Sequence, residues 1–154
     1  MNEIAETLAS KFARYRIPHV TEFLDANAFE RGDDAVVRWS KAFLKRNLRA
    51  NDQHELCDAL FSISPKGFAY LFPIWLRESL LENWTCDAAI YTANEFIFER
   101  HRWNSLSDEF AVFYTNEHLG LVSEAMLAVS ELEHFEDVRD SLRKYAKELA
   151  AIAH

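Results

Sequence analysis

Residues 64–83 read Ser-Pro-Lys-Gly-Phe-Ala-Tyr-Leu-Phe-Pro-Ile-Trp-Leu-Arg-Glu-Ser-Leu-Leu-Glu-Asn, and this stretch decides the fold. Ser64 is a favoured N-cap residue and Pro65 suits the first helical position, so the pattern predicts a helix that begins at Pro65. From Phe68 to Leu76 the stretch is apolar on nearly every side, which is typical of a buried, central helix. We therefore expect the rest of the chain to pack around it.

Pro73 lies in the interior of this predicted helix. A proline there leaves the carbonyl of Ala69 without its intrahelical donor and disfavours helical geometry at Phe72, at a cost of about 3 kcal/mol. We therefore expect a kinked or broken central helix. The polar residues of the helix share one narrow edge with Pro73, which we expect to reach water: Lys66, Tyr70 and Arg77.

Residues 65–76, Pro-Lys-Gly-Phe-Ala-Tyr-Leu-Phe-Pro-Ile-Trp-Leu, resemble the core signature of a family of uncharacterised bacterial helical proteins, which reads Pro-Glu-Ala-Phe-Arg-Tyr-Tyr-Leu-Pro-Ala-Tyr-Leu. The resemblance covers residues 50–133 if Thr115-Asn-Glu-His-Leu-Gly-Leu-Val is the family's later capped helix. It implies a helical fold and brings no catalytic residue. The departures from the family pattern include Lys66, Gly67, Ala69 and Phe72.

Length and composition indicate one all-α domain over residues 1–154. The chain has 12 Phe, 5 Tyr and 4 Trp but only three Gly and three Pro, which favours helices joined by short connections. We expect a single compact domain of seven to nine helices around the Pro-kinked central helix. The first residues lack an apolar h-region and the longest apolar run is Phe68–Leu76, so we expect no signal peptide, no membrane span and a cytoplasmic protein.

Helical periodicity and capping residues give the element boundaries. Phe110–Tyr114 is the only stretch with a strand alternative. Besides the central helix, we expect helices over 3–16, 21–29, 34–48, from Asn51 or Asp52 onward, over 87–101, as a short turn from Ser107, over 115–133 and over 136–153.

The charge is unevenly distributed along the chain. The net charge is −8, and the segment from Asn104 to Val138 contains no Lys or Arg. Its acidic residues are Asp108, Glu109, Glu117, Glu124, Glu131, Glu133, Glu136 and Asp137. The three at positions 117, 124 and 131 are seven residues apart, which places them along one side of a helix.

This acidic segment has two interpretations. Like charges held together repel one another, so a concentrated acidic face is a candidate docking surface for a basic partner protein. Alternatively, it is ordinary solvated helix surface, because acids near helix N-termini are favoured by the macrodipole. A secondary candidate surface repeats the pattern on the preceding helix and continues to Trp103, with members Asp87, Tyr91, Glu95, Glu99 and Trp103.

A basic stripe lies on the predicted helix 34–48. Its cations fall on one face and can contact phosphates, but they also suit the later turns of a helix, and the pI near 5.2 argues against a nucleic-acid partner. The basic stripe and the acidic segment can also pair between copies of the chain. The stripe consists of Arg38, Lys41, Lys45 and Arg49.

The sequence offers little catalytic chemistry. His54 and Cys57 are three residues apart on one predicted helix, which with Cys86 suggests a metal or Cys–His site, but the second close ligand pair of a structural zinc site is missing. A helical Cys is more often a small buried hydrophobe, and we expect both cysteines to be free thiols. No phosphate-binding glycine loop or nucleophile elbow occurs, so we expect no enzyme activity, metal or cofactor.

By size, acidity and helicity the chain is similar to the immunity proteins of bacterial contact-dependent growth inhibition, which bind and block a cognate toxin. This similarity and the acidic segment lead to the expectation of a binding protein for a cationic toxin domain, such as a nuclease. The alternative is a regulatory or small-ligand-binding helical domain that acts as an oligomer. A cavity beside Pro73, with the Ala69 carbonyl pointing into it, would favour that alternative.

Overall fold

The structure is a computed structural model that describes residues 2–13, 17–32, 34–45, 53–96, 98–99, 102–106 and 114–153, without the side chains of 53–55, 94–96, 98–99 and 102–106. These residues form nine α-helices, one 3₁₀ helix and one short β-hairpin, so the predicted all-α fold class is confirmed. The helices are α1 (Glu3–Lys11), α2 (Val20–Phe23), α3 (Ala26–Glu30), α4 (Asp34–Leu44), α5 (Gln53–Leu60), α6 (Pro65–Leu80), α7 (Ala88–Phe96), α9 (Asn116–Ser130), η1 (Glu133–Val138) and α10 (Arg139–Ile152).

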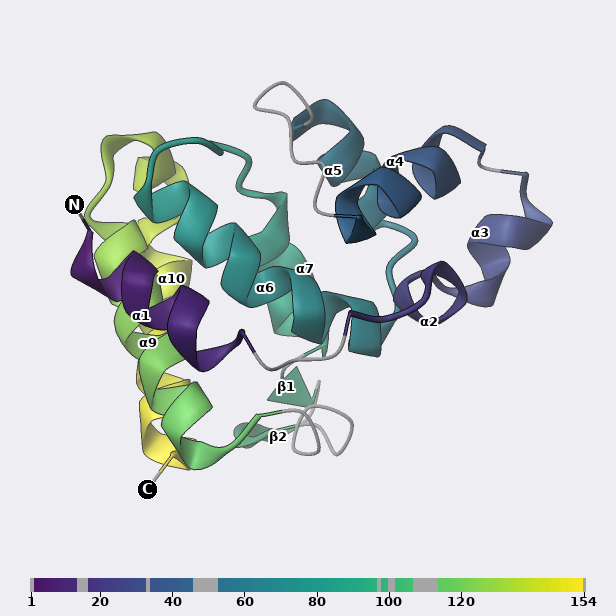
Figure 1. Ribbon diagram of the computed structural model, residues 1–154. Coiled ribbons are helices and arrows are strands. Elements are labelled where there is room, and N and C mark those ends of the chain that lie inside the picture. Colours follow the sequence, from purple (N-terminus) through teal and green to yellow (C-terminus); the bar gives the residue numbers. More distant parts are fainter. Residues whose placement is uncertain are drawn as a thin grey trace.

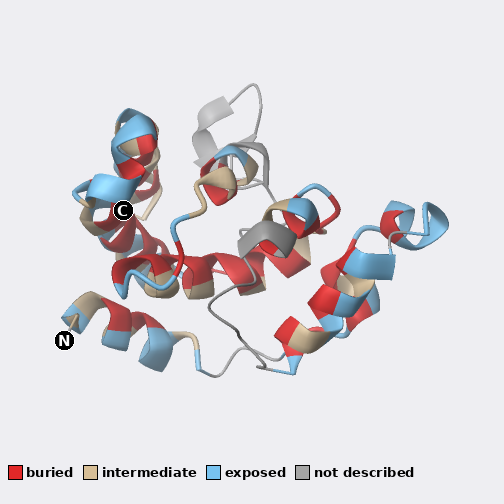
Figure 2. Cartoon of the chain, turned by 90° about the horizontal axis from the view of Figure 1, so that it is seen from above, coloured by how far each residue is buried: buried red, intermediate tan, exposed pale blue. Residues whose placement is uncertain are grey.

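Helix α6 is the centre of the molecule (Figure 1), as its sequence predicts. The Ser64 side chain accepts a hydrogen bond from the amide of Gly67 at 2.9 Å and Pro65 occupies the first turn, so the predicted start is confirmed. Phe68, Leu71 and Trp75 on this helix are completely buried. Figure 2 shows buried residues along almost the whole of this helix and exposed residues on the outward sides of the helices around it.

Helix α6 continues unbroken through Pro73, so the expected break does not occur. Tyr114, which precedes α9, donates a hydrogen bond from its hydroxyl to the Ala69 carbonyl at 2.8 Å in a buried position. This is the carbonyl that Pro73 deprives of its helical donor. Pro73 itself is buried, so the prediction that it lies on a water-exposed edge was wrong. The polar residues of that edge, Lys66, Tyr70 and Arg77, are half-buried and reach water in part.

The N-terminal end of α6 lies against the backbone that follows α2. The Ser64 amide donates to the Phe23 carbonyl at 2.9 Å, the Asp25 amide donates to Ser62 O at 2.7 Å, and Leu24 forms an isolated antiparallel bridge with Ile63. A Cβ atom on Gly67 would lie 2.1 Å from Phe23 O. The close approach of the two segments therefore requires glycine at position 67, where the resembling family has alanine.

The C-terminal end of α6 is a Schellman motif with an unusual residue. The Asn83 amide donates to Glu78 O at 2.9 Å and the Glu82 amide donates to Ser79 O at 3.0 Å. Glu82 adopts φ 60°, a left-handed conformation that normally favours glycine. Trp84, two residues after Glu82, is buried at 2% exposure and covers this end of the core.

Helices α9 and α10 form an antiparallel pair that packs with α1 against one part of α6 (Figure 1). Thr115 caps α9 as predicted, and its side chain accepts from the His118 amide at 3.2 Å. The His118 ring stacks on Phe12 with centroids 4.4 Å apart and joins the end of α1 to α9. Helix α10, which the sequence predicts over 136–153, turns an apolar stripe to the core, with Leu142 and Leu149 fully buried.

Helices α2 to α5 cover the other end of α6 (Figure 1). The inner face of α4 includes buried Trp39 and Phe43, whose rings stack with centroids 5.2 Å apart. The predicted helix 21–29 is instead two short helices, because Leu24 leaves helical geometry to pair with Ile63.

The predicted helix 87–101 was too long. Helix α7 ends at Phe96 and an antiparallel hairpin follows, formed by β1 (Phe98–Glu99) and β2 (Arg102–Leu106). Ile97, Phe98 and Trp103 are β-branched or aromatic, and such residues favour strands. The prediction followed the helical spacing of the acids instead. The strand alternative at Phe110–Tyr114 lies outside the described residues except for Tyr114, which is not in a strand.

Gly67→Ala tests the close approach at the start of α6. We expect it to lower the free energy of unfolding by about 2–3 kcal/mol, because the new Cβ meets backbone atoms that cannot move aside easily. Urea unfolding measures the change. Gly120→Ala is the matched control: Gly120 lies in α9 with open space around it, so we expect a gain of about 0.5–1 kcal/mol. Equal effects of the two substitutions would contradict the packing argument.

Tyr114→Phe tests whether the tyrosine replaces the donor that Pro73 removes. We expect a loss of about 1–2 kcal/mol, because the buried Ala69 carbonyl is left without a partner. In a Pro73→Ala background the restored helical amide bonds to Ala69 O, so the cost of Tyr114→Phe should fall to about 0.5 kcal/mol or less. A double-mutant cycle by chemical denaturation measures this coupling. If the cost is the same in both backgrounds, the two residues are not linked through this carbonyl.

Glu82→Gly tests the strained end of α6. We expect a gain of about 0.5–1 kcal/mol relative to Glu82→Ala, because only glycine adopts this left-handed conformation without a steric cost. Glu82→Ala removes the same charge and keeps the Cβ atom, so comparing the two variants by thermal unfolding isolates the backbone effect. A Gly variant no more stable than the Ala variant would exclude strain at this position.

Candidate functional site

The long helix α9 presents one exposed stripe to solvent. Its other side is buried through Leu119, Val122 and Met126, which face α6, α1 and α10. The residues of the exposed stripe are spaced by three, four and seven positions, which brings them onto one face of the helix. They are Glu117, Gly120, Glu124, Leu127 and Glu131.

Cations from other helices neutralise both ends of this stripe. Lys11 Nζ lies 2.6 Å from Glu117 Oε1 and Arg143 Nη2 lies 2.9 Å from Glu131 Oε1. The hydrogen bond from Lys11 holds the pKa of the Glu117 carboxyl below its ordinary value. The sequence segment without Lys or Arg is therefore not a surface without cations, because α1 and α10 supply them.

No described cation forms an ion pair with the middle of the stripe. Glu124 is exposed and has no ion pair with any residue that the structure describes. Leu127 follows one turn later and is 46% exposed, which is unusual for a leucine in a helix that otherwise buries its apolar residues. Sequence reasoning missed Leu127. Its signal was an apolar residue that shares a helix face with Glu124 and Glu131.

The 3₁₀ helix η1 continues the acidic surface beyond the end of α9. Phe135 anchors it, with its ring edge-on to buried Trp75 of α6 at a centroid distance of 5.6 Å. The remaining acids of η1 are exposed and have no ion pair with any described residue. They are Glu133, Glu136 and Asp137.

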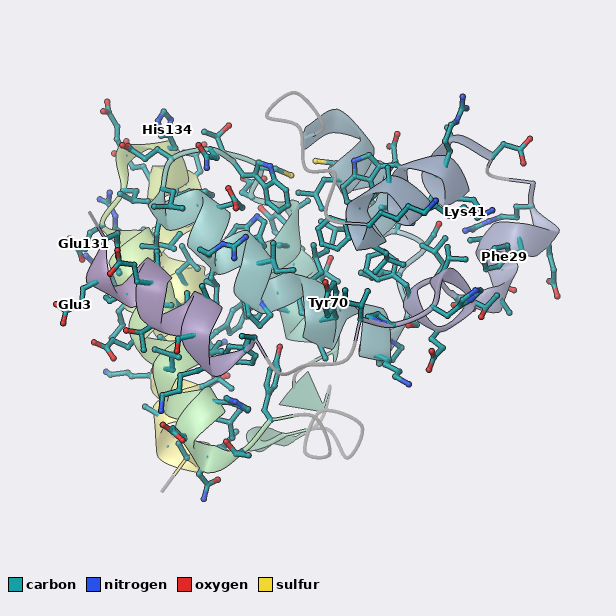
Figure 3. The ribbon with its side chains drawn as sticks, viewed as in Figure 1. Glu3, Phe29, Lys41, Tyr70, Glu131 and His134 are labelled. Atoms are coloured by element: carbon teal, nitrogen blue, oxygen red, sulfur yellow. The ribbon has the colours of Figure 1, made fainter. Side chains whose placement is uncertain are left out.

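We use the term acidic face for the exposed acids of α9 and η1 together with Leu127. Figure 3 shows Glu131 and His134 at one end of the molecule, with Lys41 and Phe29 at the opposite end. Lys41 belongs to the basic stripe of α4, whose described members Arg38, Lys41 and Lys45 are all exposed. The fold therefore separates the acidic face from the basic stripe instead of letting them neutralise each other.

Not every predicted site residue joins this face. Asp108 and Glu109 lie outside the described residues, as do the side chains of Glu95, Glu99 and Trp103. Glu99 is in strand β1, so the predicted spacing of four along one helix was wrong beyond Glu95.

The secondary surface around Tyr91 lies on a different side of α10. Tyr91 is 67% exposed, and its proximity contributes to the raised pKa of Tyr145, after burial and Glu148. Tyr145 lies on α10, and Arg143 of that helix forms an ion pair with Glu131 at the end of α9. Residues two positions apart point to nearly opposite sides of a helix, so Tyr91 and half-buried Asp87 do not extend the acidic face.

The ligand-site hypothesis for Pro73 loses its structural basis. Tyr114 occupies the Ala69 carbonyl that would have pointed into a cavity. No group of three potential metal ligands occurs among the described residues, which do not include the side chain of His54. Cys57 and Cys86 are neighbours and both are free thiols, as expected, and the His54 side chain lies outside the described residues.

None of the described helices combines the length and the apolar character needed to cross a bilayer. Comparisons with protein-family models, with curated proteins and with solved structures find no match to this chain. The resemblance to the bacterial helical family therefore remains a prediction, and the acidic face is the feature of the described residues that points to a function.

Proposed function

We propose that this chain is a binding protein that recognises a basic partner protein through the acidic face. The sharper form of the proposal is an immunity protein that neutralises a cationic toxin domain, such as a nuclease, of a bacterial growth-inhibition system. The observation that carries the proposal is a set of exposed acids on α9 and η1 that have no ion pair with any described residue, together with exposed Leu127 on α9: Glu124, Glu133, Glu136 and Asp137.

The composition of the face suits such a role. Uncompensated acids attract a cationic partner over a distance comparable to the Debye length and increase the rate of association. Leu127 supplies apolar surface that the partner would cover, which gives affinity that charge alone does not. The ion pairs at Glu117 and Glu131 are exposed and contribute little to stability, so a partner arginine or lysine can replace them at low cost.

The position of the face supports inhibition of an enzyme that acts on a polyanion. A row of carboxylates resembles the charge of a nucleic-acid backbone, so the same cationic cleft would bind either. The basic stripe of α4 lies at the other end of the molecule and does not repel the partner (Figure 3). The proposal places the protein in the cytoplasm and includes no catalytic role, cofactor or nucleic-acid ligand.

A charge-neutral variant of the face tests the proposal. Glu124→Gln, Glu133→Gln and Glu136→Gln together should weaken capture of the partner from a lysate of the native cells at about 50 mM salt by at least tenfold, and wild-type capture should fall at high salt. The matched control neutralises three exposed acids on α3, α4 and α5 at the opposite end: Glu30→Gln, Asp34→Asn and Asp58→Asn. It should capture the partner like the wild type.

The second stage tests inhibition. The captured basic protein is expressed alone and then together with this chain, and cell growth is followed. Toxicity that the wild type and the control suppress, but the acidic-face variant does not, would support an immunity role. Capture by the acidic-face variant equal to that of the wild type would remove these residues from the interface, and a partner without toxicity would restrict the proposal to binding.

A further inference from the structure

The two cysteines of the chain lie 29 positions apart in sequence and side by side in space. Cys57 is on α5 and Cys86 precedes α7, and the packing of α5 against α7 brings them together. The two side chains are close enough that Cys57 contributes to the raised pKa of the Cys86 thiol. Both cysteines are free and neither residue is fully buried.

The backbone at each cysteine is held in place by the core. Trp75 of α6 is fully buried, and its indole Nε1 donates a hydrogen bond to the Cys86 carbonyl at 2.9 Å. On α5, Leu56 next to Cys57 is also fully buried. The backbone at both cysteines is therefore held in place, which favours reaction between two neighbouring thiols.

We propose that Cys57 and Cys86 are an oxidant-responsive pair that forms a reversible disulfide and joins α5 to the start of α7. The oxidant is a small-molecule disulfide of the glutathione type. In the first step the Cys57 thiolate attacks one sulfur of the oxidant, forms a mixed disulfide and releases one thiolate. In the second step the Cys86 sulfur, after losing its proton to solvent, attacks Cys57 Sγ and displaces the second thiolate.

The balance of the reaction is complete. The protein loses two electrons and two protons from its two thiols, and the oxidant gains them to become two small thiols. The order of attack follows from the environment of Cys86. Burial, together with the hydrogen bond to Cys57, raises the pKa of the Cys86 thiol to about 12, so this thiol is protonated at neutral pH and serves as the resolving cysteine.

The disulfide would connect α5 to the connection between α6 and α7. It would close a loop of about 30 residues that contains the whole of α6. Closing such a loop lowers the conformational entropy of the unfolded chain and so stabilises the fold. The acidic face is on other elements, so the proposal is independent of partner binding and one can fail without the other.

The test uses the purified full-length chain. The reduced protein is incubated with oxidised glutathione, free thiols are blocked with N-ethylmaleimide, and the intact mass and the peptide map are measured. We expect the mass of the protein less two hydrogens, no maleimide adduct and a peptide that links Cys57 to Cys86. We also expect the melting temperature to rise by about 5 °C or more and to return after treatment with dithiothreitol.

The single variants assign the roles of the two cysteines. Cys86→Ser should accumulate a glutathione adduct on Cys57, whereas Cys57→Ser should react much more slowly. Circular dichroism confirms that both variants remain folded. A folded wild type that takes up two maleimides after exposure to the oxidant, or that yields only glutathione adducts or cross-linked dimers, would overturn the proposal. The wild-type mass decides the question even if a variant does not fold.

Discussion

The hydrogen bond from the Tyr114 hydroxyl to the Ala69 carbonyl is the interaction on which the central helix depends. Pro73 removes the amide that would normally satisfy this carbonyl, and a buried carbonyl without a partner costs about 1–3 kcal/mol. A side chain from 45 residues away supplies the missing donor. The proline is therefore tolerated in the buried part of α6, and the segment before α9 is fixed against that helix at the same point.

Much of this fold follows from local sequence patterns. The cap at Ser64, the cap at Thr115 and the apolar stripe of α10 are each determined by a few neighbouring residues, and all three were predictable. The burial of Pro73, the split between α2 and α3, and the hairpin after α7 were not. Each of these depends on a partner distant in the chain, such as Tyr114 or Ile63, and no local period records such a partner.

The same distinction applies to the acidic face. The helical spacing of Glu117, Glu124 and Glu131 placed them on one stripe, as the structure has it. The spacing does not show which of these acids is paired with a cation, because Lys11 and Arg143 come from other helices. The exposed acids that remain without a described cation, together with Leu127, give the face a centre that the linear charge map lacked.

The residue that starts α6 also joins two distant parts of the chain. The Ser64 side chain receives the Gly67 amide, while its hydroxyl donates toward the carbonyls of Glu22 and Phe23, the latter 41 residues away at 3.1 Å. One serine therefore holds both the first turn of the central helix and the closure of this long loop. Its contacts with α6 and with the end of α2 together offset the chain entropy lost in forming the turn and in closing the loop. We consequently expect exchange of the Gly67 amide with solvent to be limited by the stability of the whole domain rather than by fraying of one helix end.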